Sequence, residues 1–293
     1  MTDFPWFKNY PVGIPHELGP LEFSSLPELF ETACKKYGDR IAFENLGGKI
    51  TYSEVDKLST DFAAYLQNEL GLKKGERIAI QMPNLLQFPI AMIGSMKAGL
   101  IVVNTNPLYT PREMEHQFKD ASISAIVIVA NFAKNLEQVI AKVEVKHIIV
   151  TQMGDMLGLI KGTLTNFVVK RIKKLVPNYN LPTAIHFKAV LVKGASLQLK
   201  KPAIDIEDVA VLQYTGGTTG ISKGAELSHR NIIAHNMMIS HWFGPLIEPS
   251  QQQIVITALP LYHIFAFTVN GVLMFHKGLR NVLITNPRDI PGF

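Results

Sequence analysis

The chain has 293 residues, of which 47 % are hydrophobic and 18 % are charged, and this composition excludes a disordered protein. The net charge of +5 is too small to demand nucleic acid, but it suits anionic ligands such as nucleotides, or loose attraction to an anionic membrane. A single cysteine, Cys34, excludes a disulfide framework and a cysteine-based metal site, and this residue is expected in the core.

The N-terminal residues lack the apolar run of a signal peptide. The longest apolar stretch, residues 258–275, is interrupted by Pro260, His263 and Asn270, so no transmembrane span is expected. The sequence therefore predicts a cytoplasmic protein. It contains no basic run with interleaved aromatic residues, which argues against nucleic-acid binding.

Residues 1–22 contain four prolines among aromatic side chains, and they are predicted to form an extended arm that lies on the body. Ser25 is expected to cap a helix that ends at Gly38. The next predicted elements are strands at 41–44 and 49–52, joined as a β-hairpin by Leu46-Gly47-Gly48, and a helix from Ser53 to Leu70.

From Arg77 onward, apolar strands alternate with helical patterns that are joined by short links. Such alternation predicts an α/β fold in which doubly wound, mostly parallel sheets are flanked by helices. Ligands in these folds bind beyond the carboxyl ends of the strands. The strands are predicted at 77–82, 101–104, 123–129 and 147–151, and the helices at 85–98, 111–120 and 132–143, with a capping box from Thr110 to Glu113.

Residues 152–182 interrupt this alternation with a basic amphipathic pattern. One interpretation is a helix that lies on an anionic membrane surface. The other is a surface helix that packs on its own domain and keeps its lysines in solvent. The sequence leaves both interpretations open.

Residues 208–225 read DVAVLQYTGGTTGISKGA, a short buried strand followed by four glycines within ten residues. Glycines let backbone N–H groups converge, while threonine hydroxyls and the Lys223 ammonium add donors, so the stretch predicts a polyphosphate cradle. The alternative is a plain glycine-rich turn. The spacing fits neither the common P-loop nor the dinucleotide fingerprint. The residues assigned to this cradle are Tyr214, Thr215, Gly216, Gly217, Thr218, Thr219, Gly220, Lys223 and Gly224.

The stretch from Tyr214 to Asn231, YTGGTTGISKGAELSHRN, closely resembles the phosphate-loop signature of the adenylate-forming superfamily. This superfamily includes acyl-CoA synthetases, luciferases and the adenylation domains of peptide synthetases. The Gly216-Gly217 pair, residues 97–99 and residues 104–112 resemble bacterial long-chain fatty acyl-CoA synthetases in particular. Ser222 stands where the family usually has proline, a mild departure.

After the loop, residues 225–227 are predicted to return as a strand, and Ser228 to cap a helix from Arg230 to Ser240. The N-terminus of that helix is expected beside the cradle, where its dipole would favour anions. Further strands are predicted at 253–259 and 282–285, and a helix is expected to begin at Arg288-Asp289.

Residues 259–267, LPLYHIFAF, resemble the second signature of the family, in which a histidine and aromatic residues lie near the carboxylate and the adenylate. The resemblance implies that His263 orients the substrate carboxylate near the α-phosphate. Together with Lys223 and Thr218 it makes up the predicted catalytic set. From the residues alone, the favoured interpretation is a satisfied core histidine, because a lone histidine in an apolar stretch is usually that.

The resemblance implies that residues 23–293 form an incomplete N-terminal adenylation domain, without the small C-terminal domain of the family. Two family stretches are absent: Tyr-Gly-x-Thr-Glu, whose glutamate holds magnesium, and Thr-Gly-Asp, whose aspartate holds the ribose. No metal ligand is therefore assigned in this chain. The expectation is a fragment or one piece of a split gene, inactive by itself.

The implied activity of the parent protein is long-chain fatty acid–CoA ligation, in which ATP activates a fatty acid with Mg²⁺ and CoA then accepts the acyl group. One alternative is an inactive remnant that binds nucleotide or acyl groups. Another is a different acyl-adenylate-forming enzyme, such as a fatty acyl-AMP ligase. The sequence predicts neither the acyl chain length nor the oligomeric state.

Overall fold

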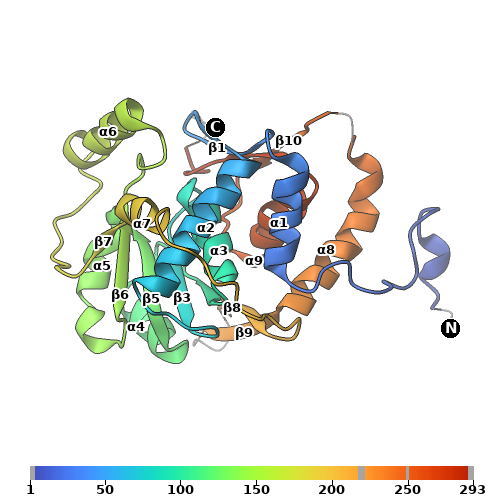
Figure 1. Cartoon of the computed structure of the whole chain (residues 1–293), viewed down its shortest axis with the longest axis horizontal. Helices are drawn as coiled ribbons and strands as arrows, with labels where there is room; N and C mark the ends of the chain where they lie inside the picture. The colour runs from blue at the N-terminus through green and yellow to red at the C-terminus, as the bar shows by residue number, and fades with distance from the viewer. Residues whose placement is uncertain (1–3, 217–221, 249–250, 290–293) are drawn as a thin grey trace.

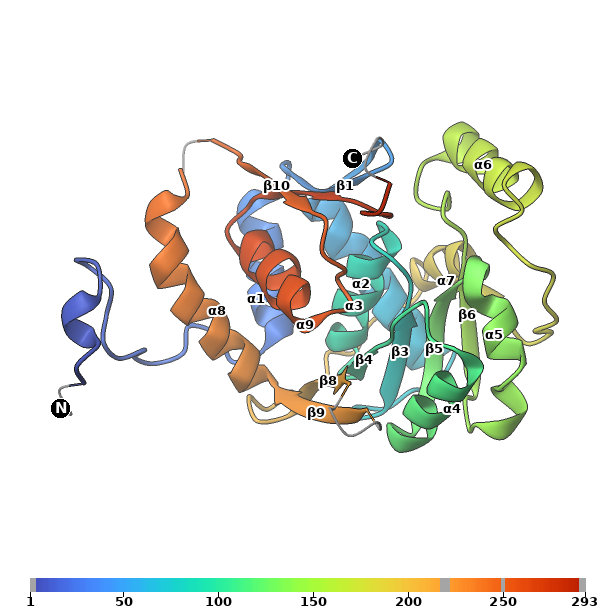
Figure 2. The same cartoon turned by 180° about the vertical axis from the view of Figure 1, so that it is seen from behind.

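The computed structural model describes residues 4–216, 222–248 and 251–289 (Figures 1 and 2). Over these residues the strands are β1 (Ile41–Asn45), β2 (Gly48–Thr51), β3 (Arg77–Gln81), β4 (Ile101–Asn104), β5 (Ile123–Val129), β6 (His147–Thr151), β7 (Ile185–His186), β8 (Val209–Thr215), β9 (Lys223–Ser228), β10 (Ile254–Thr257) and β11 (Arg280–Leu283). The helices are α1 (Leu26–Tyr37), α2 (Tyr52–Asn68), α3 (Gln87–Lys97), α4 (Pro111–Asp120), α5 (Ala133–Glu137), α6 (Leu159–Phe167), α7 (Phe187–Gly194), α8 (His229–Phe243) and α9 (Ile264–Ala266), with π-helical turns at Val168–Ile172 and Phe267–Met274.

The strands form two sheets. The larger sheet has the order β7-β6-β5-β3-β4-β8-β9 and is parallel except for the last pair, in which β9 runs antiparallel to β8. The smaller sheet has the order β10-β11-β1-β2 and is antiparallel only between β1 and β2. These arrangements confirm the prediction of doubly wound, mostly parallel sheets.

Helices cover both faces of the larger sheet and also join the two sheets. The α3 helix packs on β3 and β4, α2 packs on β1 and β2, and the two helices pack against each other (Figure 1). All eleven residues of α3 are buried, as expected of a helix enclosed between two sheets. The opposite face of the larger sheet is covered by α4 and α5, so a second apolar core lies there (Figure 2).

Several predicted boundaries are confirmed by their capping contacts. The hydroxyls of Ser25 and Thr110 accept hydrogen bonds from the backbone N–H groups of Glu28 and Glu113. The second helix begins one residue earlier than predicted, because Thr51 rather than Ser53 forms the capping box with Glu54.

One predicted helix differs from the structure. The helix expected at 132–143 is regular only over α5, because the chain then forms a 3-10 turn at Ile140–Lys142, next to the buried Val139. The helix expected to begin at Arg288 falls mostly outside the described residues; just before it the chain forms a turn, in which the Asn286 side chain accepts the Arg288 N–H at 3.2 Å.

Only part of the N-terminal arm packs against the rest of the protein. Leu18 and Leu21 pack against the main core, whereas residues 4–16 project beyond α8 and stack their aromatic rings on one another (Figure 1). The arm meets α8 through Tyr10 and Trp242, whose ring centroids lie 5.1 Å apart. The arm is therefore less attached than its sequence predicts.

The expectation for Cys34 is confirmed, since its side chain is 4 % exposed and belongs to the main core. Burial raises the pKa of the thiol to about 12, so it stays protonated at neutral pH. Among the described residues, no helix is both long and apolar enough to cross a bilayer.

Candidate functional site

The glycine-rich stretch lies between β8 and β9. Because these strands pair antiparallel, Thr215 faces Lys223 and Tyr214 faces Gly224 across the hairpin. Thr215, Gly216 and Lys223 are exposed, and the Lys223 ammonium pairs with no carboxylate among the described residues. The predicted contacts of Gly217, Thr218, Thr219 and Gly220 fall outside the described residues, so their roles stay predictions.

The base of this hairpin is fixed by α4. The buried Tyr214 hydroxyl donates to the Asp120 carboxylate, and burial, reinforced by Asp120, raises the pKa of this phenol. A ring nitrogen of His116 lies 3.0 Å from the Ser222 carbonyl oxygen, on the other side of the loop. A Cβ on Gly224 would lie 3.0 Å from the Tyr214 ring, so glycine allows the ring to pack across the strand pair. Tyr214 therefore anchors the base of the hairpin to α4. Its contact with a nucleotide stays a prediction.

The N-terminus of α8 does not lie beside the loop, and this expectation was wrong. Ser228 pairs with Val209, at the opposite end of β9 from Lys223. Five residue steps along a strand separate the two positions by about 17 Å. The helix dipole therefore acts at the opposite end of β9 from Lys223.

The first residue of α8, His229, gives the fold a pH-dependent stability. The ring is 4 % exposed and its Nδ1 accepts the Leu26 N–H at 3.1 Å, so the neutral form is required. Burial lowers its pKa to about 4, although the Asp208 carboxylate opposes the shift. Between pH 6.5 and 4 the unfolded chain then binds a proton that the folded chain does not, so stability falls as the pH falls through this window.

We expect His229 to account for about 2 kcal/mol of lost stability between pH 7 and pH 5. Replacing it with glutamine keeps an acceptor for the Leu26 N–H but removes the titration. Urea unfolding at the two pH values should therefore show a smaller pH dependence in His229→Gln than in the parent. Burial also lowers the pKa of His276 to about 4, but that residue contributes the same pH dependence to both proteins. Equal pH dependence in His229→Gln and the parent would therefore contradict the assignment.

Buried carboxamides lie beneath the loop and were missed by sequence analysis. The Asn104 side chain donates to Gln213 Oε1 at 3.1 Å, and Gln213 donates to the Tyr262 carbonyl at 3.4 Å. Gln117 of α4 donates to the Asn104 carbonyl at 3.1 Å. The network ties β4, β8 and α4 to the segment that follows β10. The available sequence signal was a polar amide at the end of an apolar strand, as at Asn104 in IVVN.

The turn after β10 carries His263, and Asn84 holds this turn in place. Asn84 follows β3; its side-chain amide donates to the carbonyls of Thr257 and Leu259 at 2.9 and 3.0 Å, and its Oδ1 accepts the Leu261 N–H at 2.8 Å. Through the Tyr262 carbonyl the turn reaches the end of β8. His263 is exposed at the start of α9, one residue beyond that contact. The structure thus brings the second signature to the strand that carries the phosphate loop.

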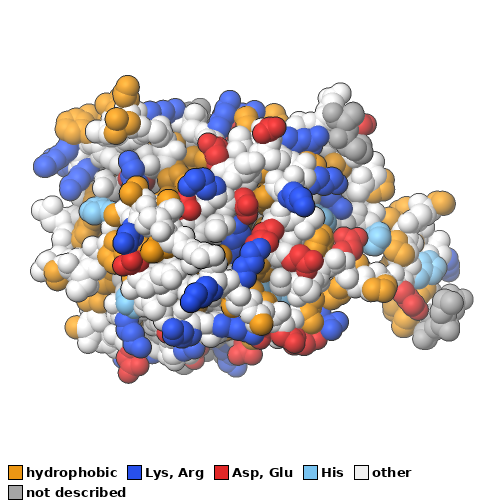
Figure 3. All heavy atoms as spheres, viewed as in Figure 1, with side chains coloured by type: hydrophobic (Ala, Val, Ile, Leu, Met, Phe, Trp, Pro, Cys, Tyr) orange, Lys and Arg blue, Asp and Glu red, His pale blue; other side chains and the backbone are white. Residues whose placement is uncertain are grey.

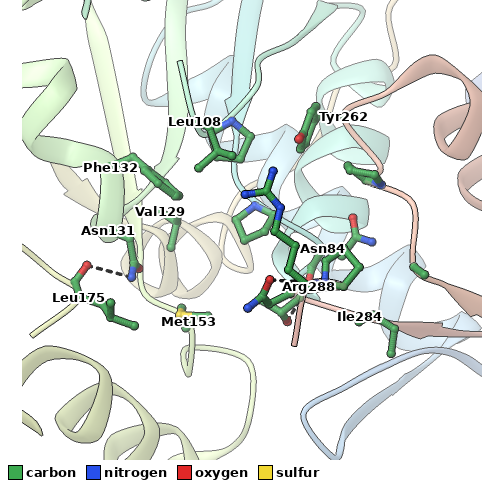
Figure 4. Close-up of a pocket in the computed structure, with 17 residues that line it drawn as sticks. Asn84, Leu108, Val129, Asn131, Phe132, Met153, Leu175, Tyr262, Ile284 and Arg288 are labelled. Carbon is green, nitrogen blue, oxygen red and sulfur yellow. Dashed lines mark hydrogen bonds between the residues drawn. The ribbon is translucent and has the colours of Figure 1, made fainter. Parts of the chain in front are cut away.

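A cavity of about 340 Å³ opens where the carboxyl ends of both sheets meet (Figure 4). Its wall is mostly apolar, and the guanidinium of Arg288 points into it near Tyr262 and Leu108. This is where ligands bind in open α/β sheets. The lining residues are Pro83, Asn84, Pro107, Leu108, Val129, Asn131, Phe132, Met153, Leu175, Ala258, Pro260, Tyr262, Ile284, Thr285, Asn286, Pro287 and Arg288.

A second cavity, of about 330 Å³, lies between α8 and the segment that follows His263. It adjoins β9 through Leu227 and α9 through Ile264. Burial lowers the pKa of His235 on its wall. The complete lining is Leu227, Asn231, Ile232, His235, Ile264, Phe265 and Thr268.

The described residues do not form a metal site. Within residues 4–216, 222–248 and 251–289, no three His, Cys, Asp or Glu side chains come together in a way that could hold an ion. The donors at the loop are amides, hydroxyls and an ammonium, which suit an anion rather than a cation.

Fold and site together define a class of protein. It is an α/β protein in which a glycine-rich loop joins two antiparallel strands, β8 and β9, at the carboxyl ends of a mostly parallel sheet, with a second, smaller sheet beside it. The family model of AMP-binding enzymes matches residues 30–293. The chain belongs to this family, which confirms the resemblance read from its two signatures.

Long-chain-fatty-acid–CoA ligases of Salmonella typhimurium and Yersinia pestis are 54 % and 55 % identical to this chain over 287 residues. The matches cover 98 % of this chain and 51 % of each relative, so the chain spans about half the length of the curated relatives it matches. A third ligase with this description, from Bacillus subtilis, is 36 % identical over 283 residues, covering 96 % of this chain and 49 % of the relative.

Solved structures give the same fold. A long-chain-fatty-acid-CoA ligase from Archaeoglobus fulgidus superposes with a TM-score of 0.73 at 22 % identity, covering 94 % of this chain and 50 % of that chain. The apo structure of Mycobacterium smegmatis MbtA has a TM-score of 0.74 at 23 % identity, covering 94 % and 46 %. At sequence identities this low, the superpositions show a shared fold and nothing about substrate or activity.

Proposed function

We propose that this chain is the nucleotide-activating part of a long-chain fatty acid–CoA ligase. The observation that carries the proposal is the β8–β9 hairpin, which sets Lys223 opposite Thr215 with both exposed beside the His263 turn. The identity of 54 % to long-chain-fatty-acid–CoA ligases over nearly the whole chain supports the same substrate class. The proposed enzyme works in the cytoplasm, since its co-substrates ATP and CoA are cytoplasmic metabolites.

In the first proposed step a carboxylate oxygen of the fatty acid forms a bond to the α-phosphorus of ATP, and the bond from that phosphorus to pyrophosphate breaks. Negative charge builds on the departing pyrophosphate. Lys223 and Thr215 face each other across the hairpin, and we propose that their ammonium and hydroxyl stabilise it together with the backbone amides of the loop, without the aid of the α8 dipole. His263 orients the carboxylate. In the second step the sulfur of CoA bonds to the acyl carbon and AMP leaves.

The acyl chain is proposed to occupy the second cavity rather than the larger one. Its wall begins at Ile264 and Phe265, directly after His263, and it also adjoins β9. A carboxylate held at His263 would therefore lead its methylene groups between α8 and α9. Mostly apolar walls are the usual lining of a site that binds an apolar group such as this methylene chain.

The test is palmitate-dependent exchange of pyrophosphate into ATP, measured on a fusion of this chain to the remaining half of the Salmonella typhimurium relative. The proposal expects exchange that requires the acid. A fusion that binds ATP but exchanges nothing with palmitate would favour the inactive remnant instead. Exchange followed by no transfer to CoA would favour a fatty acyl-AMP ligase.

A further inference from the structure

The α6 helix presents its apolar side to solvent. Ile160 is 85 % exposed, Leu164 61 % and Phe167 55 %, at the spacing that places them on one helix face. Leu159, Ile172 and Leu175 extend this exposed apolar surface at both ends. We call these six residues the α6 face. Figure 3 shows hydrophobic side chains gathered over α6, with Lys and Arg side chains next to them.

The other side of α6 is fixed to the body by small and polar residues. Gly162 is buried so close to Gly154 that a Cβ on it would lie 2.4 Å from the Gly154 carbonyl oxygen. Asn166 accepts the Gly154 N–H at 2.7 Å and donates to Asp155 at 3.1 Å. The helix is therefore oriented with its polar contacts inward and its apolar face outward, the reverse of a helix that packs on its own domain.

Apart from Asp155 on the inner side of α6, the charged side chains of this segment are of one sign. Residues 156–182 contain five basic side chains and no acidic one. The whole chain has 29 basic and 24 acidic residues, so this segment accounts for the net charge of +5 and the rest is balanced at 24 of each. All five are exposed: Lys161, Lys170, Arg171, Lys173 and Lys174.

We propose that the α6 face docks on an anionic lipid bilayer, with its apolar side chains at the boundary of headgroups and acyl chains and its five basic side chains against lipid phosphates. A second copy of this chain fits less well, because two such faces would bring ten positive charges together. Exposed apolar residues ringed by lysine and arginine are the pattern by which helices lie in a membrane interface. The proposal concerns lipid binding and does not depend on the ligase activity.

The test is co-sedimentation of the full chain with vesicles of phosphatidylcholine, either pure or mixed with phosphatidylglycerol. Binding is expected only to the anionic vesicles and should weaken as salt is added. The double variant Ile160→Ser/Phe167→Ser and the double variant Lys170→Glu/Lys173→Glu should each lower the partition coefficient about tenfold or more. The matched controls are Val192→Ser and Lys188→Glu on α7, which also change exposed residues. Both controls should leave the partition coefficient unchanged.

Phe167→Trp gives a readout that does not depend on the stability of the serine variant. Its extra fluorescence should be quenched by brominated lipid in the anionic vesicles, beyond any quenching of Trp6 and Trp242 in the parent. Equal binding to pure phosphatidylcholine, or loss of binding in the α7 controls as well, would overturn the proposal. Self-association without lipid that Ile160→Ser/Phe167→Ser abolishes would assign the face to a second copy of the chain.

Discussion

Replacing Lys223 with alanine is expected to slow palmitate-dependent pyrophosphate exchange by the fusion about 100-fold or more. Lys223 faces Thr215 at the mouth of the β8–β9 hairpin, and its ammonium pairs with no carboxylate of the described residues. It is therefore available to the charge that develops on the departing pyrophosphate. The α8 N-terminus lies at the far end of β9, so it cannot replace the lost charge.

The matched control is Lys188→Ala, which removes an exposed lysine from α7. Lys223→Arg keeps the positive charge but places it on a planar guanidinium group, so it should retain part of the exchange rate that Lys223→Ala loses. Because the interaction is strongest in the transition state, kcat should fall more than KM for ATP rises. An exchange rate for Lys223→Ala equal to that of Lys188→Ala would remove Lys223 from the proposed chemistry.

The parts of the fold that the sequence predicted are those decided by neighbours in the chain. The capping box joins Thr110 to Glu113, three residues later, and the central strands β3 to β6 are mostly apolar runs. Their signals are local, so their positions could be predicted to within a residue or two. The doubly wound class followed from the alternation of these elements.

The errors arose where the outcome depends on how strands pair or on partners far away in the sequence. The direction of β9 is set by its pairing with β8, and this pairing carries the α8 N-terminus away from the loop. Tyr214 and Asp120 are 94 residues apart in sequence, so no spacing pattern signals that α4 anchors the loop. The composition of the α6 segment left two orientations open, and only the Gly154–Gly162 contact shows which side faces inward.

Asn84 is the clearest case of a site residue that the sequence could not show, because the groups it holds lie 173 to 177 residues away. Its side chain is 2 % exposed and bridges the end of β3 to the turn that carries His263. Replacing it with alanine leaves the Leu259 carbonyl and the Leu261 N–H without these partners, whereas the Thr257 carbonyl keeps a bond from the Ile284 N–H.

We expect Asn84→Ala to lower the free energy of unfolding by about 3 kcal/mol, measured by urea denaturation, because the buried Leu261 N–H and the partly buried Leu259 carbonyl lose their partners. Asn84→Asp preserves the shape and the acceptor but sets a carboxylate against two carbonyl oxygens, so it should be no better tolerated. In contrast, Asn68→Ala removes two side-chain hydrogen bonds at the surface of α2 and should cost no more than about 1 kcal/mol. If Asn84→Ala were as mild as Asn68→Ala, the His263 turn would be held by other contacts, and Asn84 would have no part in joining the two sheets at the site.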